Sequence, residues 1–284
     1  MGRISLLYVR LISMGFKQRF MLANLTKVPV IGSALERAFF EGDRMLILPK
    51  DGVVKAASEK VVTAEVAISA EQKDVVVPSK VLEEFIRRSK HHFIMEFCIC
   101  RRSNECKDYP VHLGCLFLGK ATLKIDRSLG RQVSMEEALE HVKKCREAGL
   151  VHLIGRNKID SMWLDAFPKE ELMTICSCCP CCCLWKMLPN ISEDIGRRIR
   201  RMPGVSVSIK VDACTGCGAC AKDHVCFVKA VSISDSKARI DDSLCRGCGR
   251  CVEQCPAGAI SLDIRSPDPV GLSVKEIEDL VDLS

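Results

Sequence analysis

Two stretches in the C-terminal third of the chain, Cys214-Thr-Gly-Cys-Gly-Ala-Cys220 and Cys245-Arg-Gly-Cys-Gly-Arg-Cys251, repeat one spacing of cysteines. Each places three cysteines with two residues between neighbours, and a further cysteine follows each run. Three thiolates at this spacing can bind three irons of one cube-shaped cluster. Zinc sites more often use separated Cys-x-x-Cys pairs. The spacing therefore predicts iron–sulfur sites in this part of the chain.

Residues 207–264, which contain both runs, resemble the bacterial-type two-cluster ferredoxin domain. In that family the fourth cysteine of each run serves the cluster held by the other run. The resemblance thus implies one 4Fe–4S cluster on Cys214, Cys217, Cys220 and Cys255. It implies a second 4Fe–4S cluster on Cys245, Cys248, Cys251 and Cys226. The chain departs from the family at Cys226: five residues precede it after Cys220, where three are usual, and Phe227 stands where a proline is common.

The chain has 284 residues and 19 cysteines, with 48% hydrophobic and 27% charged residues. This composition predicts a globular protein of two modest domains. Its cysteines cluster at metal spacings and no cleavable signal peptide is evident, so we expect a cytoplasmic protein in a reducing, anaerobic setting. The net charge of +6 is too weak and too dispersed to favour nucleic-acid binding, which we do not expect.

A first upstream group holds four thiols in eighteen residues: Cys98, Cys100, Cys106 and Cys115. The Cys-x-Cys pair predicts two neighbouring thiols on extended chain, and the loop that follows can return the other two to the same place. Arg101 and Arg102 lie among them and would stabilise thiolates. The group predicts a third iron–sulfur cluster, with structural zinc or unligated thiols as alternatives.

A second upstream group holds six thiols in eight residues: Cys176, Cys178, Cys179, Cys181, Cys182 and Cys183. Adjacent side chains diverge along extended chain, and one cube needs only four thiolates. The group therefore feeds two clusters, cages one unusual cluster, or keeps spare thiols for chemistry; a strained vicinal disulfide is a further alternative. Its apolar flanks predict burial. Cys145 is different, because its phase in a predicted helix indicates a buried structural thiol.

Residues 3–25 predict an amphipathic helix, with Tyr8, Leu11 and Ile12 along one side and Arg10 and Lys17 along the other. The basic residues argue against a transmembrane span. Two interpretations stay open for this helix. It docks on its own fold or on a partner subunit, or it makes peripheral contact with an anionic membrane surface.

The remaining pattern predicts an α+β fold: a mixed α/β N-terminal domain followed by a C-terminal two-cluster ferredoxin-like module. Strands are expected at 44–48, 61–68, 151–154 and 205–211, a capped helix after Ser134, and a helix from Asn190 or Ser192 to Arg201. We divide the chain into a basic helical segment at 1–35, a cysteine-rich α+β domain at 36–204, a dicluster ferredoxin-like domain at 205–265 and an acidic tail at 266–284.

The cysteine pattern of residues 40–264 as a whole resembles a family of poorly characterised iron–sulfur proteins from strict anaerobes. The resemblance implies redox work but names no reaction. We expect a multi-cluster electron-transfer protein with one or two clusters upstream of the ferredoxin runs, acting as a subunit or partner of a larger redox enzyme. One alternative is a reductase or reductive activator with an unusual cluster at 176–183. Another is an iron–sulfur cluster carrier or scaffold.

Overall fold

The computed structural model describes residues 2–54 and 77–284, and its largest unit is a seven-stranded sheet. The strand order is β4-β2-β3-β6-β5-β1-β7. All neighbouring pairs are antiparallel except β1 and β7, which are parallel. The strands are β1 (Arg44–Ile47), β2 (His92–Met95), β3 (Leu116–Leu118), β4 (Gly130–Val133), β5 (Val151–Arg156), β6 (Met173–Cys178) and β7 (Ile199–Arg201).

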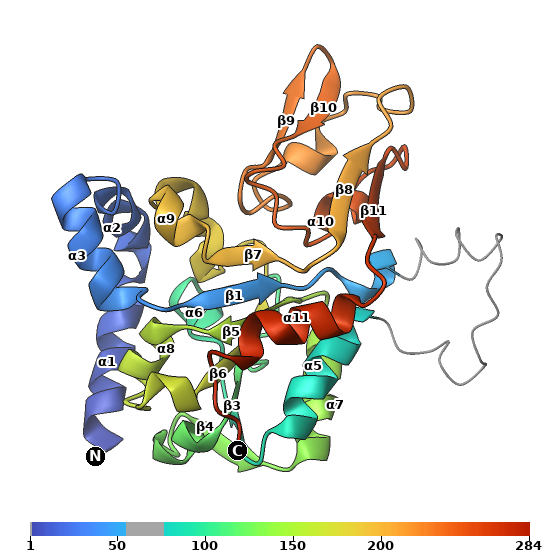
Figure 1. The fold of residues 1–284 in the computed structure, drawn as a ribbon. Coiled ribbons are helices and arrows are strands. Elements are labelled where there is room, and N and C mark those ends of the chain that lie inside the picture. The colour runs from blue at the N-terminus through green and yellow to red at the C-terminus, as the bar shows by residue number, and fades with distance from the viewer. Residues whose placement is uncertain (1, 55–76) are drawn as a thin grey trace, which may run out of the picture.

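Helices cover both faces of this sheet (Figure 1). One face buries α5 (Val77–Arg88), α7 (Met135–Glu147) and α11 (Pro269–Glu278) against β1, β3 and β6. The other face carries α1 (Gly2–Gly15), η1 (Phe16–Gln18), α2 (Arg19–Leu25), α3 (Pro29–Phe39), α6 (Ile99–Ser103), α8 (Lys158–Trp163) and η5 (Leu184–Asn190). The short elements η3 (Lys120–Lys124), η4 (Lys169–Glu171) and α9 (Glu193–Gly196) complete this part.

The cysteine runs near the C-terminus form a separate module at one end of the molecule (Figure 1). It consists of two small antiparallel sheets, β8 (Val205–Ile209) with β11 (Ile260–Ile264) and β9 (Val231–Ser234) with β10 (Lys237–Ile240). The turns η6 (Ala219–Ala221) and α10 (Arg250–Glu253) each follow a left-handed glycine within a cysteine run. The observed architecture is therefore mixed α and β, as the sequence predicts.

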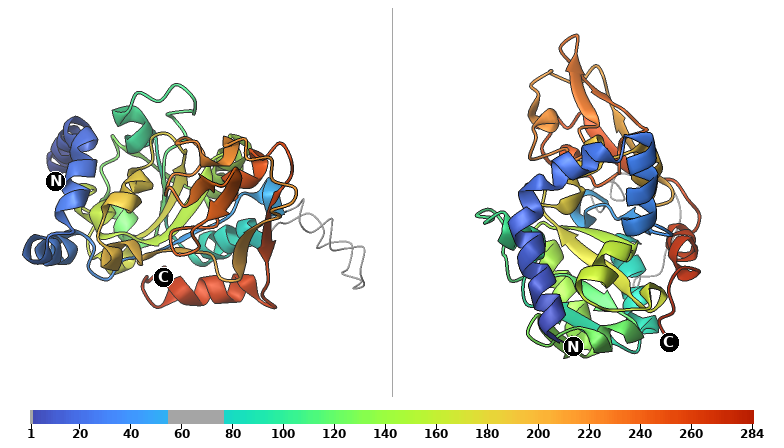
Figure 2. Two further views of the ribbon diagram at one scale, coloured as in Figure 1. Left: turned by 90° about the horizontal axis from the view of Figure 1, so that it is seen from above. Right: turned by 90° about the vertical axis from the view of Figure 1, so that its left-hand side faces the viewer.

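The acidic C-terminal stretch folds back from this module onto the large sheet, where α11 packs beside α5 (Figure 2). Val274 and Ile277 of α11 are buried in the main core. On its outer side, Glu276 pairs with Arg200 at 2.7 Å and Glu278 with Arg88 at 3.0 Å. Acidic residues of the C-terminal stretch therefore form ion pairs within the molecule.

Several predicted elements are confirmed, above all the capped helix after Ser134. The Ser134 hydroxyl accepts from the Glu137 backbone amide, and the Glu137 side chain accepts from the Ser134 amide. The expected helix to Arg201 is wrong: α9 ends at Gly196, and residues 199–201 form β7 because they pair with β1. Tertiary pairing has overridden local propensity there. The strand expected at 61–68 lies outside the described residues.

The predicted helix at 3–25 is divided by the 3₁₀ turn η1, and its buried face differs from the expected one. Val9, Phe16 and Ala23 are buried, whereas Leu11, placed on the apolar side by the sequence pattern, is 53% exposed. The segment docks on its own fold through contacts of α1 with α6 and of α2 with η5. None of the helices in the described ranges is both long and apolar enough to cross a membrane.

Candidate iron–sulfur centres

The structure gathers Cys214, Cys217, Cys220 and Cys255, here called the outer quartet, around one small cavity in the module. The backbone amide of Ala238 donates to the Cys214 sulfur at 3.4 Å, and that of Ala259 donates to the Cys255 sulfur at 3.3 Å. A Cβ on Gly216 would lie 2.1 Å from the Ser236 carbonyl oxygen, so only glycine allows this loop to close. The converging thiols and amide donors suit a cube with inorganic sulfide.

Cys226, Cys245, Cys248 and Cys251, here called the inner quartet, line a second cavity of the same kind. The Cys226 sulfur accepts from the Ala230 amide at 3.2 Å, the same four-residue relation that joins Cys255 to Ala259. The longer spacing before Cys226 therefore does not remove it from the site. Each quartet has one buried thiol, Cys220 or Cys251, but the outer quartet also has an exposed one, Cys217.

The structure interleaves the two upstream groups of cysteines instead of keeping them apart as the sequence suggested. β3 and β6 pair with Leu116 opposite Ile175, which brings Cys115 and Cys176 together at 3.7 Å. From this pair, further thiol–thiol contacts extend to Cys98 and Cys100 on one side and to Cys178 and Cys183 on the other. The six-thiol set runs in the order Cys100, Cys98, Cys115, Cys176, Cys178, Cys183.

Local structure explains which thiols face this set. Cys176 and Cys178 are two residues apart on β6 and share a face, while Ser177 points to the other side, toward His152. Cys98 precedes α6 and Cys100 lies in its first turn, so the expectation of an extended Cys-x-Cys segment is wrong. The pKa of the Cys98 thiol is lowered by hydrogen bonds from Cys100 and Cys115 and by the charge of Arg101.

The remaining upstream thiols form a four-thiol set, Cys106, Cys179, Cys181 and Cys182. All four sulfur atoms lie within 4.8 Å of one another. Cys181 is 3.5 Å from Cys106 and 3.6 Å from Cys182. The loop between α6 and β3 supplies Cys106, and the turn after β6 supplies the other three. This set and the six-thiol set therefore both draw their thiols from residues 98–115 and 176–183.

Arg101 lies between these two sets with a fully buried side chain. It donates to the carbonyls of Pro110 at 2.8 Å and Ser177 at 2.7 Å, and also to that of Leu113. Burial works to lower the pKa of Arg101, but thiolates of both sets raise it, and the net direction is upward. A buried cation with three carbonyl partners offsets thiolate charge and ties the loop after α6 to β6.

Two other buried arginines join the thiols to the rest of the molecule, and sequence reasoning missed both. Arg250 of α10, between two inner-quartet cysteines, donates to the Cys178 carbonyl at 2.5 Å. Arg19 of α2 stacks on Phe16 and Phe20, 4.3 Å from each ring centre, and thiolates of both sets oppose the lowering of its pKa by burial. The sequence signal that could have revealed Arg19 is its position between Phe16 and Phe20, which can stack on a guanidinium group.

The inner quartet and the six-thiol set pack against the same apolar cluster. Cys183 is buried within it, and Cys176, Cys178, Cys226, Cys245 and Cys248 contact its edge. A smaller cluster, which contains Val225 and Ile260, packs against thiols of both the outer and the inner quartet. The three sets of thiols thus follow one another through apolar packing, from the exposed outer quartet to the large sheet.

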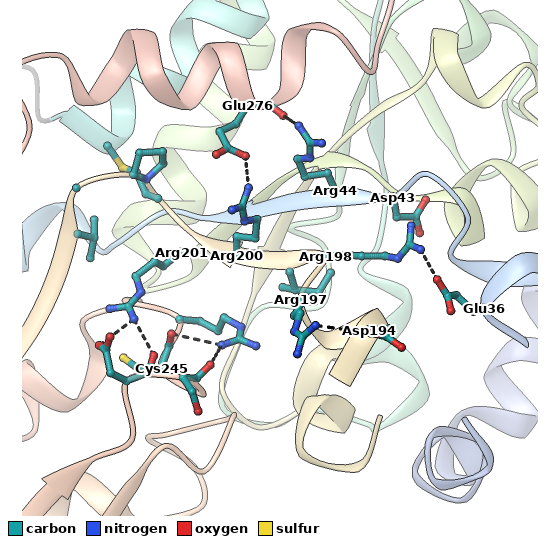
Figure 3. A pocket seen from close by; sticks show the side chains of 18 residues that line it. Glu36, Asp43, Arg44, Asp194, Arg197, Arg198, Arg200, Arg201, Cys245 and Glu276 are labelled. Atoms are coloured by element: carbon teal, nitrogen blue, oxygen red, sulfur yellow. Dashed lines mark hydrogen bonds and ion pairs between the residues drawn. The ribbon is translucent and has the colours of Figure 1, made fainter. Parts of the chain in front are cut away.

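The arginine-rich run after α9 lines a cleft of about 890 Å³ beside Cys245 (Figure 3). Arg198 pairs with Glu36, Arg200 with Glu276 and Arg201 with Asp242. These pairs join the run to α3, to α11 and to the module. The arginines therefore hold parts of the molecule together around the inner quartet, and Arg197 and Arg200 also present charge to solvent.

Two buried groups near the thiols have a structural role. Cys145 lies on α7 with a fully buried side chain, as the sequence predicts, and burial raises the pKa of its thiol to about 11. Burial, together with the charge of Arg146, lowers the pKa of His152 to about 3, so this imidazole is neutral. Neither group belongs to a candidate ligand set.

Comparison with known proteins identifies part of this region. Residues 238–261 match the 4Fe–4S binding domain family, a stretch that includes Cys245, Cys248, Cys251 and Cys255. A segment of 51 residues is 37% identical to the indolepyruvate oxidoreductase subunit IorA of Pyrococcus horikoshii. That segment is 18% of this chain and 8% of the relative, so the chain spans a small part of that protein. No solved structure matches. The chain therefore contains a 4Fe–4S binding domain.

Proposed function

We propose that this protein is a multi-cluster iron–sulfur electron carrier, acting as a subunit or partner of a larger anaerobic redox enzyme. The outer and inner quartets each bind one 4Fe–4S cluster, and four of the six-thiol set bind a third. We propose the same four functional parts as the sequence suggested: a basic helical segment, a cysteine-rich domain, a ferredoxin-like module and an acidic tail. The observation that supports it best is the apolar packing shared by the inner quartet and the six-thiol set.

In this proposal electrons enter at the outer quartet, where Cys217 is exposed, and pass inward through the inner quartet. The clusters would supply one-electron chemistry, and the chain's own residues set their surroundings. Amides of Ala230 and Ala259 donate to ligand sulfurs, and Arg101 and Arg250 place positive charge beside the thiolates. A relative that is named as an oxidoreductase subunit favours an enzyme-subunit partner.

Anaerobic reconstitution followed by iron and sulfide counting tests the proposal. We expect about twelve irons per chain, since each cube holds four. A Cys176→Ser/Cys178→Ser variant should fall to about eight, while Cys145→Ala, which alters a thiol outside all sets, should keep about twelve. About eight irons in the unaltered protein would limit cluster binding to the module and contradict the third cluster.

A reductase or reductive activator is the second candidate, because an apolar cavity of about 800 Å³ lies beside the six-thiol set. Arg19, Leu184 and Met187 line it, and Leu184 follows Cys183 directly. Six thiols also exceed the four that one cube needs. An open iron site is the distinguishing property: paramagnetic resonance signals that change on adding small ligands would favour catalysis, and unchanged signals would favour the electron carrier.

We also propose that residues 3–25 contact an anionic membrane surface in a cytoplasmic setting. Leu7, Leu11 and Met14 follow one face of α1 and are 56%, 53% and 78% exposed. Arg10 and Lys17 are exposed close to them. Apolar side chains flanked by basic ones are typical of helices that lie in the membrane interface.

A further inference from the structure

The four-thiol set differs from both quartets in how closely its sulfur atoms approach. A tetrahedral Zn²⁺ ion with Zn–S bonds of about 2.3 Å requires sulfur atoms about 3.8 Å apart. Cys106, Cys181 and Cys182 show contacts of 3.5 and 3.6 Å, and all four sulfurs lie within 4.8 Å of one another. No other cysteine, histidine or carboxylate group in residues 2–54 and 77–284 comes together so tightly in threes or more. Both quartets and the six-thiol set are therefore more open.

The backbone around these sulfurs is built as it is in metal-binding turns. The Cys182 amide donates to the Cys179 sulfur at 3.3 Å, across a turn begun by Pro180. The amides of Asp108 and Tyr109 donate to the Cys106 sulfur. Amide donors that point at a thiolate stabilise its charge and hold it in the direction of an ion.

The surroundings close the site on its inner side. Cys179 and Cys182 are buried, and Leu113 and Leu150 pack against the set. Positive charge comes from the buried Arg101, on which Cys179 acts electrostatically. Four ligands from the chain complete a tetrahedral shell and leave no position for a substrate, as in structural zinc sites.

We propose that Cys106, Cys179, Cys181 and Cys182 form a mononuclear tetrathiolate site that binds Zn²⁺. The ion joins the loop after α6 to the turn after β6. Cys115 lies in that same loop and Cys183 ends that same turn, while the adjoining α6 and β6 carry Cys100, Cys176 and Cys178, so the ion fixes backbone that presents the six-thiol set. The inference goes beyond the proposed function, since this site transfers no electron.

Metal analysis of the full chain, purified without oxygen, tests the inference. We expect about one zinc per chain in addition to iron, and its loss in Cys181→Ser. Cys145→Ala is the matched control, because that thiol is buried nearby but lies outside the set, and it should retain the zinc. In chain stripped of zinc and refilled with Co²⁺, we expect visible absorption bands of tetrahedral cobalt thiolate, which Cys181→Ser should lack.

Two results would overturn the inference. One is an unaltered protein with neither zinc nor, after Co²⁺ addition, tetrahedral cobalt bands. The other is a Cys181→Ser variant that keeps its zinc and loses about four irons, which would make Cys181 a cluster ligand. Zinc and iron counts separate the two proposals. Zinc with only about eight irons would exclude the third cluster and leave this site, whereas about twelve irons without zinc or cobalt binding would keep the third cluster and exclude this site.

Discussion

At the scale of single residues, charge beside the thiols depends on arginines whose partners are distant in sequence. Arg101 is the clearest case, because it is fully buried and joins the loop after α6, through Pro110 and Leu113, to the distant Ser177 of β6. The sequence showed an arginine among cysteines but not that it is enclosed between two sets of thiols. That placement depends on the pairing of β3 with β6, which no local pattern specifies.

We predict that Arg101→Leu removes the cluster on the six-thiol set. Three buried carbonyls would lose their donor and the thiolates their countercharge, at a cost of about 3 kcal/mol or more. Iron should fall from about twelve to about eight per chain. The control is Arg102→Leu. The native Arg102 side chain is exposed and stacks on Phe97, so this variant should keep its iron. About twelve irons in Arg101→Leu, as in the control, would show that Arg101 is not needed for this cluster.

We predict that stability falls as pH rises toward 8, in part through Asp43. Burial raises the pKa of this carboxyl from 3.8 to about 7, against an opposing hydrogen bond from the Lys158 amide. A raised pKa means that the folded form binds the proton more tightly, so its contribution is complete below pH 3.8 and lost through pH 7.

Asp43→Asn keeps an acceptor for Lys158 and removes this titration. It should be more stable than the unaltered protein at pH 8, by at most about 4 kcal/mol, with little difference at low pH. Anaerobic thermal unfolding at pH 5 and pH 8 measures the effect, with exposed Asp212→Asn as control. A gain of the same size at both pH values would exclude titration of Asp43 as its cause.

At the scale of elements, the sequence predicted what local spacing determines and failed where distant pairing decides. The cysteine runs, the capping box at Ser134 and the buried Cys145 were readable because their signals lie within a few residues. Residues 199–201 read as helix, yet they form β7 through β1. The two upstream cysteine groups read as separate sites, since contacts such as Cys106 with Cys181 join segments that are far apart.

The exposed face of α1 leads to a prediction about membranes. A Leu11→Asp/Met14→Asp variant should bind anionic lipid vesicles about tenfold or more weakly, because each apolar side chain contributes about 1.5–3 kcal/mol when buried. Vesicle co-sedimentation at low ionic strength measures the bound fraction. Val211→Asp, a similarly exposed apolar position in the module, is the control and should bind like the unaltered protein. Undiminished binding by the α1 variant would exclude this helix as the contact.

At the scale of the whole molecule, the outer quartet, the inner quartet and the six-thiol set are joined in that order by shared apolar packing. The outer quartet is the most exposed, the inner quartet lies between two apolar clusters, and the six-thiol set lies against the large sheet. The Arg250 contact with the Cys178 carbonyl joins the module to that sheet. Such an order suits a carrier that takes electrons at one end and delivers them inside.

The central claim is that electrons reach the upstream centre through the inner quartet. Rapid-freeze paramagnetic resonance after mixing with reduced flavodoxin tests it, because a protein donor is too large to reach buried thiols directly. In the unaltered protein we expect the outer cluster, the inner cluster and the upstream centre to become reduced in that order. In Cys248→Ser/Cys251→Ser, the outer cluster should still be reduced while the upstream centre stays oxidised. Reduction of the upstream centre at an unchanged rate in that variant would contradict the account.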